Sequence, residues 1–142
     1  MPEVRAISLA AGSKKLVAIC SDNHLRVWDC DSCAVLKAIN IERSGELTCL
    51  SFSKESEYLL VGTSTGVVLG YDAKSLGERN INILNKPICK DRIQSIAWFH
   101  YAGEAQSRRF LTLTRDGNVK LFSFYFERVK EGTKEKLMGR AN

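Results

Sequence analysis

One pattern of strands and turns occurs three times in this sequence, and such a repeat restricts the fold more than any single motif does. The three stretches are KLVAICSDNHLRVWD (15–29), YLLVGTSTGVVLGYD (58–72) and FLTLTRDGNVKLFSF (110–124). Each is a short run rich in strand-forming residues, then a polar turn, then a second such run. The turns hold Asp-Asn, Thr-Gly and Asp-Gly, and Asn and Gly tolerate the positive φ angles of tight hairpins. The sequence therefore predicts three β-hairpins.

Further strand-like runs flank these hairpins. The runs 4–10, 47–53 and 93–99 precede them, and each alternates large apolar residues with small or polar ones. This alternation is typical of a strand with one buried face. The runs 34–40 and 79–85 follow the first two hairpins, and we expect each to form a fourth strand.

The spacing of the units supports a true repeat. Trp28 and Tyr71 hold the same place in the first two units and are 43 residues apart. The additional residues of the third unit fall in connecting segments, mainly around 100–107, where insertions are tolerated best. The segment 126–142 is rich in charge, and we expect a tail or a marginal helix there.

The unit resembles the repeat of the WD-repeat β-propeller family, most clearly at SDNHLRVWD (21–29) and TRDGNVKLF (114–122). The resemblance implies an all-β fold of tandem four-stranded antiparallel propeller blades, in an open arc of about three blades. Within 1–125 it implies three repeats, at approximately 4–40, 47–85 and 93–125. A charged C-terminal tail, 126–142, follows them. The structural blade positions that it assigns are Asp22, Trp28, Asp29, Tyr71, Asp72, Asp116 and Phe122.

The resemblance also implies a hydrogen-bond network in each blade. In the family a turn aspartate joins a Ser or Thr, the strand Trp and a His from the loop before the first strand. Asp22 and Trp28 match two of these places in the first unit, and Asp116 matches one in the third. Glu46 and Asp91 lie near the place of the His, so we expect an incomplete network, with Trp28 in a packed core.

The number of repeats indicates open ends. Propellers typically have 4–8 blades and close into a ring, which protects their strand edges. Three units cannot close a ring of ordinary blades, and uncovered edges invite association. We therefore expect a part of a larger propeller, or ends that are covered by further blades or by self-association.

Composition favours a soluble globular protein: 44% of the residues are hydrophobic, 26% are charged, and the net charge is +5. The longest stretch without a charge or His, 58–71, is shorter than the about 20 apolar residues of a membrane span. No signal peptide is recognisable near the N-terminus. Five cysteines, an odd number, favour reduced thiols and a cytoplasmic protein, with the nucleus as an alternative.

Two short motifs suggest chemistry, and both have a simpler structural explanation. Residues 62–66 match G-x-S-x-G around Ser64, but a nucleophile elbow needs a following helix, and a strand is predicted here. Cys30 and Cys33 form a lone C-x-x-C, whereas a structural zinc site needs four ligands. We therefore expect no catalytic residues, no metal and no cofactor, although an enzyme acting through Ser64 or the cysteine pair stays a third hypothesis.

The leading functional hypothesis is a non-catalytic protein-interaction scaffold, because a stiff blade assembly presents many loops on one face. The alternative is a component of an RNA-processing or other nucleic-acid-associated complex. The basic residues are scattered, so direct contact with nucleic acid is not expected. The expected partners are other proteins, and the loop before each first strand is the favoured surface, with 100–108 as a secondary candidate. Its candidate binding residues are Arg43, Glu46, Lys90, Asp91 and Arg92.

Overall fold

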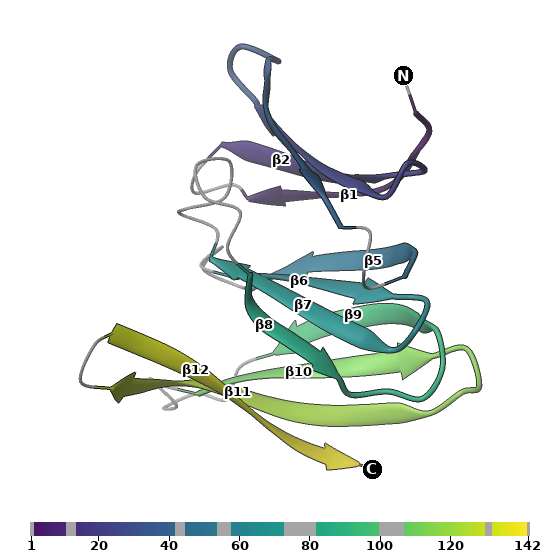
Figure 1. Ribbon diagram of the computed structural model, residues 1–142, viewed down its shortest axis with the longest axis vertical. Coiled ribbons are helices and arrows are strands. Elements are labelled where there is room, and N and C mark those ends of the chain that lie inside the picture. The colour runs from purple at the N-terminus through teal and green to yellow at the C-terminus, as the bar shows by residue number, and fades with distance from the viewer. Residues whose placement is uncertain are drawn as a thin grey trace.

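The part of the chain that the structure describes folds into three antiparallel sheets of four strands each. The computed structural model describes residues 2–10, 14–41, 45–53, 58–72, 82–99, 107–129 and 132–141. Figure 1 shows the sheets as three stacked layers in chain order, with the N-terminal sheet at the top and the C-terminal sheet at the bottom. No helix among these residues is long and apolar enough to cross a membrane.

Within each sheet, consecutive strands are hydrogen-bonded neighbours, so every sheet is a four-stranded meander. The first sheet consists of β1 (Val4–Ala10), β2 (Lys15–Cys20), β3 (His24–Asp29) and β4 (Val35–Asn40). The second consists of β5 (Leu47–Phe52), β6 (Tyr58–Thr63), β7 (Val67–Asp72) and β8 (Asn82–Pro87). The third consists of β9 (Ile93–Phe99), β10 (Ser107–Thr114), β11 (Val119–Val129) and β12 (Gly132–Ala141). The predicted all-β fold of four-stranded antiparallel units is confirmed.

The first strands of the three sheets lie next to one another, since β1 contacts β5 and β5 contacts β9. An irregularity in the pairing of these strands is also repeated. In β1 the pairing register shifts between Val4 and Ala6, and in β5 it shifts between Leu47 and Cys49, which is the same place one repeat later. The first strands of the first two sheets are therefore equivalent residue by residue.

One hydrophobic cluster fills the space between the first and second sheets. Val17 and Ile19 of β2 alternate with residues that point the other way, as the two-residue period of a strand requires. They pack with Leu59 and Val61 of β6, and all four side chains are fully buried. The remaining buried members of the cluster are Leu25, Val27, Ile39, Ile41, Leu47, Leu69 and Tyr71.

A second cluster, rich in aromatic rings, fills the space between the second and third sheets. Ring centroids are 6.4 Å apart for Tyr58 and Trp98, 5.7 Å for Trp98 and Phe110, and 5.3 Å for Phe110 and Phe122. The Trp98 indole Nε1 donates a hydrogen bond to the Ser51 carbonyl at 3.1 Å. Aromatic contacts of this kind add to the burial energy, and the indole bond fixes the third sheet against the second.

The expectation of a charged tail or marginal helix at 126–142 is wrong, because most of this segment is strand. β11 continues to Val129, and every residue of β12 is paired with a residue of β11. Charge was misleading because an edge strand has one unpaired side, where charged residues are common. The register places Glu127 opposite Lys134 and Val129 opposite Gly132.

Candidate functional site

Three hairpin turns and two connectors between sheets meet at one edge of the stack. Backbone hydrogen bonds join them: the Ser64 amide donates to the Glu46 carbonyl at 2.8 Å, and the Arg115 amide donates to the Arg92 carbonyl at 2.9 Å. We call this set of segments the connector edge. It consists of residues 21–23, 45–46, 64–66, 88–92 and 115–117.

Asn23 holds the first connector through its side chain. Its φ is +64°, a left-handed conformation that Asn adopts more readily than most residues. Its Nδ2 donates to the carbonyls of Ile41 and Gly45, the latter at 2.8 Å. Its Oδ1 accepts a hydrogen bond from the Leu47 amide at 2.8 Å. The turn of the first sheet is thus clamped to the chain that begins the second.

Gly66 is the equivalent residue of the second sheet, and it contacts its connector directly. Its carbonyl accepts hydrogen bonds from the amides of Ile88 at 3.2 Å and Cys89 at 3.0 Å. A Cβ at Gly66 would lie 2.1 Å from the Cys89 carbonyl oxygen, and the φ of +83° also favours glycine. Gly117, the equivalent in the third sheet, has a φ of +86° but no described atom within 4 Å of that place.

A row of ion pairs runs along the connector edge across all three sheets. Glu46 lies at its centre: Oε1 pairs with Arg5 of β1, and Oε2 is 3.1 Å from Nη1 of Arg92 in the next connector. Beside it, Asp91 pairs with Arg115 of the third turn at 2.8 Å. These side chains are partly exposed, from 24% for Asp91 to 65% for Arg115. The edge therefore presents alternating charge to solvent.

The first turn adds a further pair at the same edge. The Asp22 carboxylate accepts two hydrogen bonds from the Arg26 guanidinium, at 2.9 Å and 2.7 Å, and a longer one from the His24 amide. The Arg26 hydrogen bonds lower the pKa of Asp22 from 3.8 to about 2. The Arg26 pKa is raised for the same reason. Asp22 is thus held by Arg26, a partner that the sequence analysis missed although it lies only four residues away.

The other two turns are held by the last residue of their second strand. The hydroxyl of Thr114 donates to the Asp116 carboxylate, which also binds the Asn118 amide nitrogen Nδ2 at 2.8 Å. The Thr114 hydrogen bond lowers the pKa of Asp116. In the second turn, Thr63 and Thr65 share a hydrogen bond of 3.2 Å. Each turn therefore has its own local network.

Comparison with known proteins identifies this architecture. The family model for the WD domain, G-beta repeat, matches residues 2–29. The structures of U3-55K and of the RRP9 WD40 repeats each align with a TM-score of 0.71 and 15% identity, over 97% of this chain and 39% of theirs. The WD40 domain of SCAP from fission yeast aligns with a TM-score of 0.69 and 14% identity, over all of this chain and 32% of that domain.

The three sheets have the fold of WD40 propeller blades, and the first of them also matches the repeat model. At these identities the likeness is one of fold, and the chain spans 39% or less of the propellers to which it aligns. We number the blades 1 to 3 in chain order. The connector edge is then one rim of a three-blade arc.

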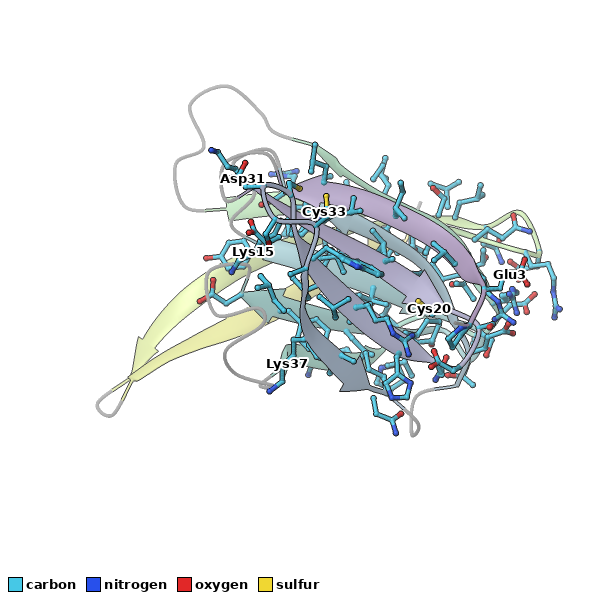
Figure 2. All side chains as sticks on the ribbon, turned by 90° about the horizontal axis from the view of Figure 1, so that it is seen from above. Glu3, Lys15, Cys20, Asp31, Cys33 and Lys37 are labelled. Atoms are coloured by element: carbon cyan, nitrogen blue, oxygen red, sulfur yellow. The ribbon has the colours of Figure 1, made fainter. Side chains whose placement is uncertain are left out.

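The face of blade 1 that points away from blade 2 is not covered by any described segment. It holds an open, largely apolar pocket of about 480 Å³. The lining residues are Val4, Ile7, Leu16, Ala18, Trp28, Asp29, Cys30 and Cys33. Figure 2 looks onto this face, with Glu3 and Cys20 at the connector edge and Asp31 and Cys33 at the opposite edge. Trp28 is half-buried there, so the expectation that it lies in a packed core is wrong.

The motifs that suggested chemistry occupy turns. Ser64 lies in the turn between β6 and β7, as the hairpin interpretation predicted. Its Oγ accepts a hydrogen bond from the Glu46 amide at 3.0 Å. Cys30 and Cys33 lie exposed in the loop between β3 and β4 as free thiols. Among the described residues, no group of three His, Cys, Asp or Glu side chains is arranged to hold a metal ion.

The predicted structural residues in or at the end of the third strands fall at two kinds of place. Tyr71 and Phe122 are buried, each facing the preceding blade. Asp29 ends β3, and its carboxylate accepts the Ser32 hydroxyl at 2.7 Å, which lowers the pKa of Asp29. Asp72 ends β7 opposite Tyr58.

The predicted binding residues gather at the connector edge. Glu46, Asp91 and Arg92 belong to the ion-pair row, and Lys90 is exposed in the same connector. Arg43 lies outside the described residues, as do residues 100–106 of the secondary candidate loop. What sequence reasoning missed is Arg5 and Arg115, which come from a strand and a hairpin turn rather than from a connector.

Proposed function

We propose that the protein is a non-catalytic interaction scaffold that binds another protein through the connector edge. The observation that carries the proposal is the ion-pair row from Arg5 through Glu46 to Arg92, with Asp91 and Arg115 beside it. This row spans all three blades, so the stacking of the blades fixes the distances between its charged groups.

The rigidity of this edge supports a binding role. The Asn23 and Gly66 contacts fix both connectors by hydrogen bonds to their backbones. A surface that is already ordered loses less conformational entropy when a partner binds. Opposite charges at fixed positions also favour partners with the complementary pattern, which contributes to specificity.

The same edge favours a protein partner over direct contact with nucleic acid. Phosphate binding draws on clustered positive charge. Here each arginine of the row is paired with a carboxylate: Arg5 and Arg92 share Glu46, and Arg115 binds Asp91. The proposed site of action is intracellular, for which the odd number of cysteines in the sequence is the support.

The test is recovery of partners from cells with the tagged chain and two charge-reversal variants. One variant carries Lys90→Glu and Arg115→Glu at the connector edge, where both residues are exposed. The control carries Lys14→Glu alone, at the opposite edge, where Lys14 is 68% exposed. Thermal melts verify that both variants are folded.

The proposal predicts that proteins recovered with the wild type are lost from the connector-edge variant and retained by the Lys14→Glu control. Equal recovery with all three chains would contradict it. Recovery that depends on RNA, and disappears after nuclease treatment, would favour the nucleic-acid alternative instead.

A further inference from the structure

We infer that the uncovered face of blade 1 binds the uncovered face of blade 3 from a second copy, so that two chains close a six-bladed ring. This inference concerns the ends of the arc and is independent of the proposed function at the connector edge. It rests on the equivalence of the blades.

The uncovered face of blade 1 has the same positions that form the two junctions inside the chain. Its members are Val4, Ile7, Leu9, Leu16, Ala18 and Trp28. One repeat later, in the same order, stand Leu47, Leu50, Phe52, Leu59, Val61 and Tyr71, which pack against blade 1. In blade 3 the positions hold Ile93, Ile96, Trp98, Phe110, Thr112 and Phe122, and these face blade 2.

The apolar side chains of β1 on this face of blade 1 are exposed to solvent. Ile7 is 61% exposed and Leu9 is 55% exposed. Val4 of the same face is 44% exposed, whereas the equivalent residues at the buried junctions, Leu47 and Ile93, are 1% and 0% exposed. The third-strand aromatic residue always faces the preceding blade, and Trp28 is the one that has no preceding blade within the described residues.

The outer face of blade 3 has the complementary set of positions. Its residues are Leu111, Leu113, Val119 and Leu121. In blade 1 the equivalent positions are Val17, Ile19, Leu25 and Val27, and all four are fully buried against blade 2. In blade 3, Leu113 is 38% exposed and Val119 is 42% exposed. The two uncovered faces of the chain are therefore the two halves of one blade junction.

Charge at the connector edge agrees with this pairing. At the junction of blades 2 and 3, Glu46 pairs with Arg92, and these residues hold equivalent places in their blades. Glu3 holds that place in blade 1. A second copy docked in the same way brings Glu3 of one chain to Arg92 of the other, a pair of opposite charge.

Closure sets the number of copies. Head-to-tail contacts form a ring when the rotation closes, and propellers typically have 4–8 blades. Six is the only multiple of three in that range, so a ring built from these three blades alone holds two copies of them. Closure removes both open strand faces, which would otherwise favour association without a fixed end point.

Light scattering after size exclusion tests the inference with the whole chain. The wild type should have twice the 15.9 kDa mass of one chain. Ile7→Asp and Leu113→Asp each damage one face and should each give monomers. Mixed in equal amounts they should again form dimers, because each variant keeps the face that the other has lost.

Glu3→Arg provides a second test that leaves the apolar faces unchanged. It should raise the dissociation constant of the dimer by about two- to thirtyfold, because both junctions of the ring lose an exposed ion pair. A wild type that stays monomeric at about a hundred micromolar would overturn the inference. So would a dimer that persists in both aspartate variants, or a pair of folded variants that do not associate on mixing.

Discussion

The side chain of Asn23 reaches the backbone of Leu47 across the first blade junction, accepting its amide hydrogen at 2.8 Å. The same side chain donates to two carbonyls of the connector, those of Ile41 and Gly45. One residue of a hairpin turn therefore fixes both the path of the connector and the start of the next blade.

Replacing Asn23 by Ala should destabilise the protein by about 2–4 kcal/mol, because three hydrogen bonds of about 1 kcal/mol each are lost in a partly buried place. Chemical denaturation measures this change. Asn118→Ala is the matched control, since Asn118 makes an exposed bond within its own turn, and it should cost less than about 1 kcal/mol. Equal effects of the two substitutions would show that the clamp contributes nothing.

Gly66→Ala and Gly117→Ala separate backbone strain from contact between blades. Both glycines have a positive φ, of +83° and +86°, so both substitutions should cost about 1–2 kcal/mol of strain. Only at Gly66 would the new Cβ overlap a carbonyl, that of Cys89. Gly66→Ala should therefore lower the melting temperature further than Gly117→Ala does. Identical melting temperatures would contradict the close packing of the second connector.

Phe110→Ala should cost about 3–5 kcal/mol, as is usual for removing a fully buried aromatic side chain. Phe110 has ring contacts with both Trp98 and Phe122 at the junction of blades 2 and 3. Equilibrium unfolding in urea gives the value. A loss below about 1 kcal/mol would mean that blade 3 is not packed against blade 2.

The pairing of Asp22 with Arg26 predicts a dependence of stability on acid. The folded-state pKa of Asp22 is about 2, below the usual 3.8, so its contribution is present above about pH 4 and is lost as the pH falls toward 2. Asp22→Asn should melt at a lower temperature than the wild type at pH 6, and the difference should shrink toward zero near pH 2. A difference that is constant over this range would rule out the ion pair as its cause.

The burial of Tyr71 predicts that the protein loses stability at high pH. Burial raises its pKa from 10.0 to about 12, because the ionised phenol would lose its hydration. Stability is therefore retained below pH 10 and lost as the pH rises through 12. The melting temperatures of the wild type and of Tyr71→Phe should be similar at the low end of this pH range. At the high end, the wild type should melt at a lower temperature than the Phe variant. Parallel curves would contradict the burial of Tyr71.

The sequence was sufficient for the features that repeat. Strand-forming runs on either side of a polar turn predicted the hairpins at 15–29 and 58–72, and the turns at Asn23 and Gly66 carried a recognisable signal. β12 was missed because its residues are charged, and its strand conformation comes from pairing with β11 along its whole length.

The candidate site shows a different limit. The connectors were predicted as a surface from their place in the repeat, and Glu46 and Arg92 were named for that reason. Their pairing was out of reach, because Glu46 lies 41 residues from Arg5 and 46 from Arg92 along the chain. The incomplete burial of Trp28 was also unpredictable from its motif, since its burial depends on whether a preceding blade is present.

Lysine labelling within the native assembly tests the central claim, partner binding at the connector edge, most directly. Lys90 marks this edge and Lys14 marks the opposite one, so their acylation by a soluble reagent can be compared in the purified chain and in the assembly recovered from cells. The account predicts that Lys90 is protected in the assembly while Lys14 reacts equally in both samples. Protection of Lys14 with unchanged labelling of Lys90 would contradict it.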